Sequence, residues 1–377
     1  MRKLVLFILL HSFVYSQTAF HNYGNVQMHT DAEIGFHTHL VNDGTFNDNL
    51  GFTGFYSDTE TLTVSGNNRA IFNNVEIGVI NNLELYTAMG VRKELLFLDG
   101  KVITPREDLT VSLDFINYDL YAGEDDFRHV DGYTSNTGSN EFIFPIGDDD
   151  RLRPMITPTQ EPNTYLHGAY FYEDPNTANT FATSFATNQK HFEIDVVSNY
   201  EFWDLNGTTA TSVTLTWDNL SNISLISPVL NDLIVVGWNI VNERWENLGN
   251  TKMTGDINAG SITSIPFTPN QYDIITFGSL GEISNNYYIS PNGDEYDEFL
   301  VFEELEEYPL SKLIIFNRWG NLVFERENYE NDFSGISEGR ATLKRKKELP
   351  VGTYFYELNY GSNDLSLSKK GWVYIHR

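Results

Sequence analysis

The sequence predicts an all-β protein in which a β-solenoid-like region, an antiparallel β-sandwich and a C-terminal Ig-like β-sandwich follow one another. Short apolar runs end in Asn, Gly or Asp along the whole chain of 377 residues, which is the pattern of strands and turns. Hardly any segment has the 3.6-residue periodicity of an amphipathic helix. Aromatic residues make up 14% of the chain, and Phe and Tyr suit packed sheets.

The first 16 residues have the features of a signal peptide. Two basic residues open the chain, a mostly apolar run follows from Leu4 to Val14, and Ser16 places a small residue at the cleavage point. A membrane anchor is the alternative, but a transmembrane helix needs about 20 apolar residues and this run is shorter. We therefore expect residues 1–16 to be removed on export, and no transmembrane span in the mature chain.

Residues 17–140 repeat one theme, in which turns rich in Asn and Gly separate short strands. The expected strands include Ala70–Ile77, Leu83–Tyr86 and Glu94–Leu98. The turns recur irregularly, about every 15 to 25 residues, as in the stacked coils of a parallel β-solenoid. An antiparallel sandwich is the alternative, and we favour the solenoid.

Residues 141–280 read as an antiparallel β-sandwich. Expected strands are His191–Val197, Ser212–Trp217, Leu233–Trp238 and Tyr272–Phe277. Four tryptophans of this region are expected to pack in the core or at strand edges rather than to stack on a ligand: Trp203, Trp217, Trp238 and Trp245.

Charge and cysteine content exclude several classes of function. The formal net charge is −28, and most of the acidic excess precedes residue 288, so a nucleic-acid partner is not expected. The chain contains no cysteine, which excludes disulfides, thiolate metal sites and cysteine nucleophiles. The stability of the exported protein must therefore come from burial of apolar surface.

Five short motifs follow one another in residues 287–377. They include Pro291-Asn292-Gly293-Asp294, Asn317-Arg318-Trp319-Gly320, Tyr329-Glu330-Asn331-Asp332-Phe333-Ser334-Gly335, Pro350-Val351-Gly352-Thr353-Tyr354 and Lys370-Gly371-Trp372, with Arg377 after the last. By these motifs the segment resembles the gliding motility-associated C-terminal domain, which is the type B sorting domain of the type IX secretion system of Bacteroidetes.

The resemblance implies export in two steps. The signal peptide takes the chain across the inner membrane, and the folded C-terminal domain then directs it through the translocon in the outer membrane. Domains of this type are paired with an outer-membrane barrel of the PorP/SprF kind and tend to stay on the cell surface. The motif residues named above are then the secretion and attachment signal.

The residues of this segment also predict its local structure. Lys312–Phe316 and Leu322–Glu325 flank the Asn317–Asn321 turn as a hairpin, and Gly352–Tyr360 alternates like a strand with two differently packed faces. A small antiparallel sandwich is expected. Arg318 and the basic run Lys344–Lys347 are candidate docking charges, although a solvated loop is the alternative for the run.

Asn292, Asp294, Asp297 and Glu298 are oxygen ligands at close spacing, which could hold Ca²⁺. The spacing and closing Glu of an EF-hand loop are not present, and Glu295 stands where the sorting-domain pattern has a second Gly. An Asx-rich turn without metal is the alternative.

Two further clusters carry weaker signals. Asp148–Asp150 lies beside Arg151 and Arg153, which favours a turn with local ion pairs, with calcium or a basic partner as alternatives. His37 and His39 would lie on one face of a strand, where they could bind zinc, although packing or surface positions are more usual.

No catalytic motif selects an active site, so we do not expect an enzyme. The favoured hypothesis is a surface structural or adhesion protein exported by type IX secretion. A calcium-dependent module that binds surface glycans is the alternative, and a polysaccharide-acting enzyme comes last, because paired carboxylates cannot be recognised from sequence.

Overall fold

The computed structural model describes residues 18–281, 285–308, 310–338, 347–361 and 366–377. The expected signal peptide lies outside these residues. The chain divides into two compact units, Met1–Leu280 and Gly281–Arg377. We call the described part of the first unit the body and that of the second the C-terminal unit.

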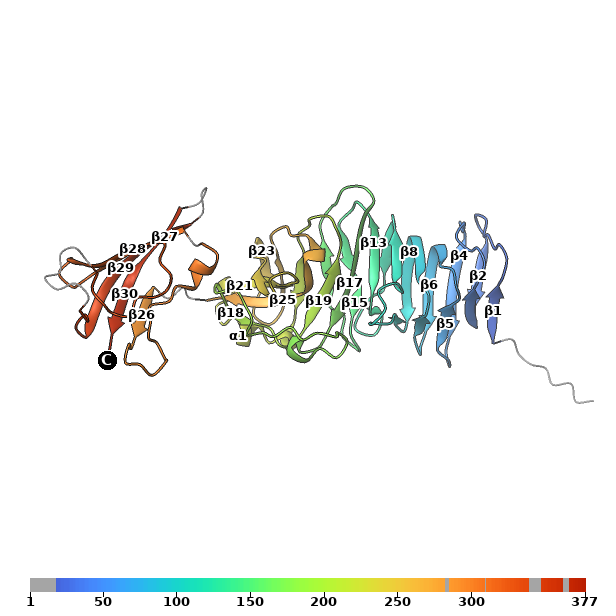
Figure 1. The fold of residues 1–377 in the computed structure, drawn as a ribbon. Helices are drawn as coiled ribbons and strands as arrows, with labels where there is room; N and C mark the ends of the chain where they lie inside the picture. Colours follow the sequence, from blue (N-terminus) through green and yellow to red (C-terminus); the bar gives the residue numbers. More distant parts are fainter. Residues whose placement is uncertain (1–17, 282–284, 309, 339–346, 362–365) are drawn as a thin grey trace, which may run out of the picture. The chain divides into compact units, whose positions relative to one another are not determined.

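About six coils of a parallel β-solenoid form the first half of the body (Figure 1), which confirms the predicted solenoid. Each coil gives one strand to a seven-stranded sheet and one to a larger sheet. The seven-stranded sheet contains β1 (Ala19–Asn22), β3 (His39–Asn42), β5 (Leu62–Ser65), β7 (Leu83–Leu85), β9 (Val102–Ile103), β12 (Val130–Asp131) and β15 (Ile146–Gly147). The solenoid strands of the larger sheet are β2 (Glu33–Phe36), β4 (Phe52–Ser57), β6 (Ala70–Val79), β8 (Met89–Asp99), β10 (Leu113–Ile116), β11 (Leu120–Ala122) and β13 (Thr134–Gly138).

Each coil buries its apolar side chains on the next coil. Phe36 pairs with Phe55, Phe55 with Ile77 and Ile77 with Phe97, and all four are buried. The rings of Phe36 and Phe55 stack with centroids 5.1 Å apart. This parallel register gives the all-apolar interior that a repeat needs, since one coil alone cannot bury its face.

The larger sheet continues without a break from the solenoid into the sandwich. After β13 the pairing becomes antiparallel, through β17 (Thr164–Phe171), β19 (Phe202–Asn206), β25 (Tyr272–Leu280), β21 (Leu233–Asn239) and β22 (Arg244–Asn247), with β18 (Ile194–Val197) on β25. A second sheet packs as β14 (Phe142–Phe144), β16 (Met155–Thr157), β20 (Thr214–Trp217), β24 (Gly260–Thr263) and β23 (Lys252–Gly255). The solenoid and the sandwich therefore share one sheet.

One apolar core runs through the body from Met28 to Phe277. A second cluster, with Trp238 and Trp245, lies among residues 133–274 and includes side chains from β17, β19, β21 and β25. All four tryptophans of the body are buried, as predicted. Helical structure is limited to short turns: η1 (Pro175–Thr177), η2 (Asn219–Ser221), α1 (Ile223–Ile226), η3 (Leu230–Asp232) and η4 (Pro269–Gln271).

The C-terminal unit is built on one five-stranded sheet. Its order is β26 (Asn286–Ile289), β30 (Ser366–Ile375), β29 (Gly352–Gly361), β27 (Leu310–Phe316) and β28 (Leu322–Glu327), and η5 (Glu303–Glu306) follows β26. Short segments joined by the bridges Leu300–Phe333 and Ile336–Glu348 complete a sandwich with its own core. The predicted β27–β28 hairpin is present, but β26 pairs with β30 in parallel, which the sequence did not indicate.

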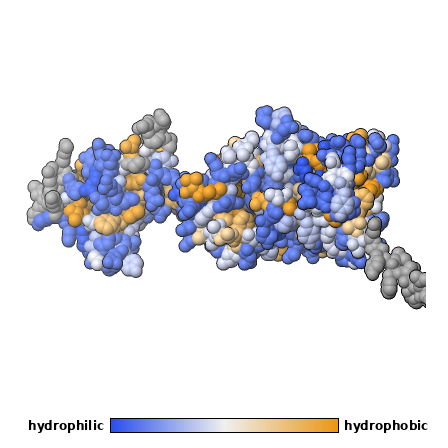
Figure 2. Space-filling view, turned by 45° about the vertical axis from the view of Figure 1, so that its right-hand side comes forward, coloured by the Kyte–Doolittle hydropathy of each residue, from blue (hydrophilic) through white to orange (hydrophobic). Residues whose placement is uncertain are grey.

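Hydrophilic residues cover most of the body surface seen in Figure 2, and apolar residues are scattered among them. Scattered apolar residues are normal for a protein surface. Among the residues that the structure describes, no helix has the length and apolar character needed to cross a membrane.

Candidate functional site

Two of the sequence motifs meet at a pocket of about 350 Å³ on the C-terminal unit. One wall is the β27–β28 turn, where Gly320 has a φ of +78°, a conformation that favours glycine. The Asn317 side-chain oxygen accepts hydrogen bonds from the backbone N–H groups of Trp319 and Asn321, both at 3.0 Å. The Arg318 guanidinium lies 4.9 Å from the centre of the Trp319 ring, and Trp319 is 74% exposed.

The other wall is the start of β29. Pro350, Gly352, Thr353 and Tyr354 line the same pocket, because the β27–β29 register brings the end of one strand beside the start of the other. The Tyr354 hydroxyl donates to the Pro350 carbonyl at 2.9 Å, and burial raises the pKa of the Tyr354 hydroxyl. This hydrogen bond links Tyr354 of β29 to the turn that precedes the strand. We call the pocket between the two walls the motif pocket.

Arg377 and Gly371, two further motif residues, bring neighbouring segments of the unit together. The Arg377 guanidinium donates to the carbonyls of Gly335 (3.1 Å) and Leu349, so it joins the segments before and after the 339–346 region. A Cβ atom on Gly371 would lie 1.5 Å from the Asn285 carbonyl oxygen. Glycine at this position of β30 allows the chain that enters β26 to pass close to the strand.

The first motif forms a tight loop after β26. The Glu298 carboxylate accepts hydrogen bonds from the N–H groups of Gly293 (2.5 Å) and Asp294 (3.0 Å). Asn292 and Asp294 bond each other, and this contact with Asn292 is the main cause that lowers the pKa of the Asp294 carboxyl. These bonds make an Asx-rich turn, and calcium binding by Asn292, Asp294, Asp297 and Glu298 stays a prediction.

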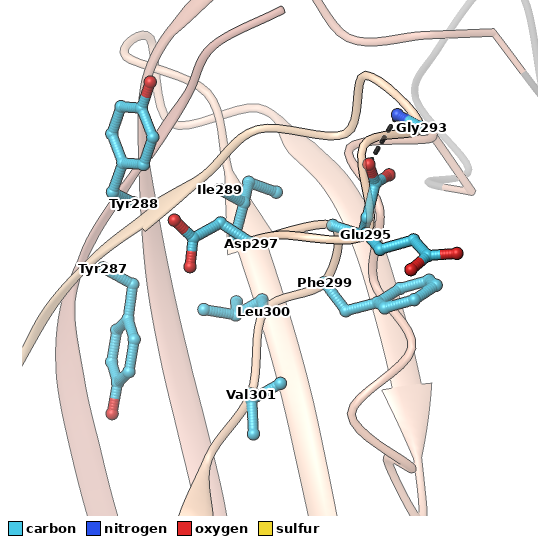
Figure 3. Close-up of a pocket in the computed structure, with 10 residues that line it drawn as sticks. Tyr287, Tyr288, Ile289, Gly293, Glu295, Asp297, Phe299, Leu300 and Val301 are labelled. Carbon is cyan, nitrogen blue, oxygen red and sulfur yellow. Dashed lines mark hydrogen bonds between the residues drawn. The ribbon is translucent and has the colours of Figure 1, made fainter.

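A groove of about 570 Å³ lies beside this loop (Figure 3). Tyr287, Tyr288 and Ile289 of β26 line one side. Glu295, Asp297, Glu298, Phe299, Leu300 and Val301 of the returning chain line the other side, with Gly293 of the loop. This groove and the motif pocket share no lining residue.

The sequence reasoning missed a buried ion pair in the C-terminal unit. The Lys369 ammonium contacts the Glu304 carboxylate, donates to the Tyr287 hydroxyl at 2.7 Å and lies 5.2 Å from the centre of that ring. The alternation of inward and outward side chains along β30 could have indicated that Lys369 is buried. Residue 369 has the same parity as the buried Val373 and Ile375, so its side chain faces the core.

The Asp148–Asp150 cluster of the body differs from the prediction. The predicted local ion pairs of Arg151 and Arg153 are wrong, because both guanidiniums point into the core and contact Glu201 and Asp218. The strands β16, β19 and β20 bring these distant residues together, which no local pattern indicates.

Asp148 instead pairs with Arg106 at 3.1 Å, and burial raises the pKa of its carboxyl. Carboxylate oxygens of Asp131, Asp148 and Asp149 lie within 4.8 Å of one another. Arg106 also contacts Asp131 at 2.6 Å. The neighbouring cation therefore already offsets part of the negative charge of this group.

The predicted pairing of His37 and His39 on one strand face is wrong. β2 ends at Phe36 and β3 begins at His39, so the two histidines lie at a corner between two sheets. The His39 Nδ1 accepts a hydrogen bond from the Thr63 N–H at 3.1 Å, which leaves that nitrogen unavailable to a metal. Of the basic run, Lys344–Lys346 lies outside the described residues, and Lys347 is exposed.

Together these features define a chain with a repeat body and a separate C-terminal unit that displays its motif residues. Residues 282–375 match the family model of the CHU_C type IX secretion signal domain. The match identifies this segment as a type IX secretion signal domain and the chain as a substrate of that secretion system. No curated protein and no solved structure matches the chain.

Proposed function

We propose that this protein is a structural or adhesion protein of the cell surface, exported by type IX secretion and retained by an outer-membrane barrel of the PorP/SprF kind. The observation that carries this proposal is the meeting of two sorting motifs at one exposed pocket. Arg318 and Trp319 are exposed there, beside the start of β29. An exposed arginine and tryptophan side by side are typical of a protein-binding hot spot.

The body supports a structural or binding role for the exported part. Its core is continuous through the solenoid and the sandwich, and Arg151 and Arg153 form buried ion pairs with Glu201. A stacked repeat offers an extended surface to partners, which suits adhesion. The C-terminal unit folds around a separate core, as expected of a signal that travels with different bodies.

Surface protease accessibility in a native-type host tests this proposal. The full-length chain, a chain that ends at Leu280 and the variant Arg318→Ala/Trp319→Ala are compared. We expect external protease to cleave the full-length wild type and not the chain that ends at Leu280. In the double variant, the cleaved fraction should be at least tenfold lower than in the wild type. Lys312→Ala, which changes a partly exposed cation of the same unit outside the five motifs and outside the motif pocket, is the matched control. Equal exposure of the full-length and shortened chains would contradict the proposal.

A calcium-dependent carbohydrate-binding role is the second candidate. The closeness of the Asp131, Asp148 and Asp149 oxygens favours it, as does the carboxylate-rich loop at Asp294. Calorimetric titration with Ca²⁺ of the wild type, Asp149→Asn and Asp294→Asn would assign a site, and glycan-array binding with and without chelator would test the role. Identical array profiles in both conditions would remove calcium from the function.

A further inference from the structure

The first coil of the solenoid, residues 18–37, has a coil stacked on only one of its sides within the described chain. β1 pairs with β3 alone, and β2 pairs with β4 alone. Both strands lie at the end of the body (Figure 1), and each keeps one unpaired backbone edge there. We call the surface formed by these two edges the open end.

Printed backbone hydrogen bonds show which groups point to the open end. The Asn22 carbonyl accepts from the Asp43 N–H at 2.9 Å, so Asn22 of β1 faces the second coil. The Ala32 carbonyl, just before β2, likewise accepts from the Phe52 N–H at 2.8 Å. Backbone groups of successive residues alternate between the two edges of a strand. Four residues therefore direct their N–H and C=O groups outward: Ala19, His21, Glu33 and Gly35.

The apolar interior is also unfinished at the open end. Phe20 pairs in register with Leu40, and Leu40 with Val64. Leu40 is 0% exposed and Val64 1%, whereas Phe20, which has no strand on its outer side, is 36% exposed. Ile34 of β2 is only partly buried against the same core. A solenoid normally ends in a repeat with a polar outer face, so an apolar end with unpaired backbone groups is a surface for association.

The construction of the open end selects its occupant. A single extended segment would cover one of the two edges and leave the other unpaired. A second copy of the first coil presents β1 and β2 at the same spacing, and twofold dimers with such a self-complementary interface are the commonest homo-oligomers. The local charge permits the contact. Residues 18–37 contain two acidic residues and no Lys or Arg, although the whole chain carries a net charge of −28.

We propose that two copies of this protein join through their open ends, which makes both solenoid sheets continuous across the dimer. β1 pairs antiparallel with β1 of the second copy about Phe20, and β2 pairs with its counterpart about Ile34. These centres set outward backbone groups against outward backbone groups, so the hydrogen bonds of both edges are satisfied. The two Phe20 side chains meet and close the apolar interior. This interface does not depend on the secretion role.

The register about Ile34 also suits the charges of β2. It places Glu33 opposite Gly35 of the second copy, and so avoids two like charges in direct opposition, which would be destabilising. Beyond the ends of the strand, the same register brings Asp31 toward His37 of the second copy. Both of these side chains are exposed in the single chain. An acid therefore meets an imidazole across the dimer.

Sedimentation velocity of the mature chain tests the proposal. We expect a dimer whose dissociation constant rises at least tenfold in Phe20→Lys, because two cations would then meet at the centre of the β1 pair. Leu120→Lys makes the same kind of change at an exposed position of β11 and should dimerise like the wild type. A monomer up to millimolar concentration, or a dimer that Phe20→Lys leaves intact, would overturn the proposal.

Disulfide trapping locates the contact without introducing charge. The chain contains no cysteine, so a single introduced cysteine reports only on its own position. Two residues that form a non-hydrogen-bonded antiparallel pair have Cα atoms about 4.5 Å apart, which suits a disulfide. Under mild oxidation, Ile34→Cys should cross-link at least tenfold faster than the control Leu120→Cys. Equal rates in the two variants would indicate random collision and would overturn the proposal.

Discussion

In the body, the guanidiniums of Arg151 and Arg153 point into the core, whereas in the C-terminal unit the guanidinium of Arg318 lies on the surface against an exposed tryptophan. Both sets of residues belong to short motifs that stand out in the sequence. The body motif binds strands of its own chain together, and the terminal motif remains available to another molecule. A conspicuous motif can thus serve either the fold of its own chain or contact with another molecule. Burial of its side chains distinguishes the two cases.

The largest expected effect tests the buried arginines of the body. Glu201→Gln should destabilise the body by about 3–5 kcal/mol, because it leaves two buried guanidiniums with a single carboxylate partner. Denaturant unfolding followed by tryptophan fluorescence reports mainly on the body, which holds four of the six tryptophans. Glu60→Gln, at an exposed position, should change the free energy of unfolding by less than about 0.5 kcal/mol. Equal changes in the free energy of unfolding for Glu201→Gln and Glu60→Gln would contradict a stabilising role of the buried arginine pairs.

The second prediction concerns the buried pair of the C-terminal unit. Lys369→Met leaves the Glu304 carboxylate buried without its cation and should cost about 3 kcal/mol. The double variant Lys369→Met/Glu304→Gln should recover at least half of the loss, because no unpaired charge then remains. Hydrogen exchange of the β29 and β30 amides measures the stability of this unit, and no recovery in the double variant would contradict an ion-pair role.

Gly371→Ala should have a smaller effect, about 1–3 kcal/mol, through the clash of its Cβ with the Asn285 carbonyl. β26 must move away from β30, so the amides of residues 286–289 should exchange faster than those of β27. Lys370→Ala, at the next residue of the same strand, is the control. Uniform faster exchange across the sheet would mean that the substitution acts on the whole unit instead.

The smallest net effect concerns the pH dependence of the body, where two buried groups oppose each other. Burial raises the pKa of Asp204 to about 7 and lowers the pKa of His167 to about 4. As pH rises from about 4 to 7, the first shift removes stability, because folding binds that proton, and the second restores it. Because the two shifts act in opposite directions, their combined effect on the free energy of unfolding should be smaller than the effect of either shift alone.

Single substitutions should reveal each slope. In the Asp204→Asn variant, the free energy of unfolding of the body should increase as pH rises toward 6.5, because only the His167 shift remains. In the His167→Gln variant, it should decrease as pH rises toward 7, because only the Asp204 shift remains. Thermal unfolding at a series of pH values measures both slopes. The same sign in both variants would contradict the assignment.

Sequence patterns predicted the parts that depend on local chemistry. The turn-rich repeats of residues 17–140 predicted the solenoid, and the alternation of residues 352–360 predicted β29. They could not predict that the solenoid sheet continues into the sandwich, because β17 pairs with β13 across a turn region and changes direction there. Strand direction depends on long-range packing, which periodicity does not contain.

The site divides in the same way. The motifs named the residues of the motif pocket, but its shape depends on the register in which Phe316 faces Phe355. The groove beside β26 is lined mostly by residues outside the five motifs. It arises because the returning chain separates from β26 where Leu300 bridges Phe333, and these two residues lie far apart in sequence.

The strand order of the C-terminal unit has a consequence for the timing of synthesis. β30 is the last strand of the unit along the chain, yet it lies between β26 and β29 inside the sheet. A ribosome must therefore complete the body and then residues through Ile375 before β26 gains its neighbour. A chain interrupted before residue 366 would lack the strand that joins β26 to β29, so the five-stranded sheet could not form in it.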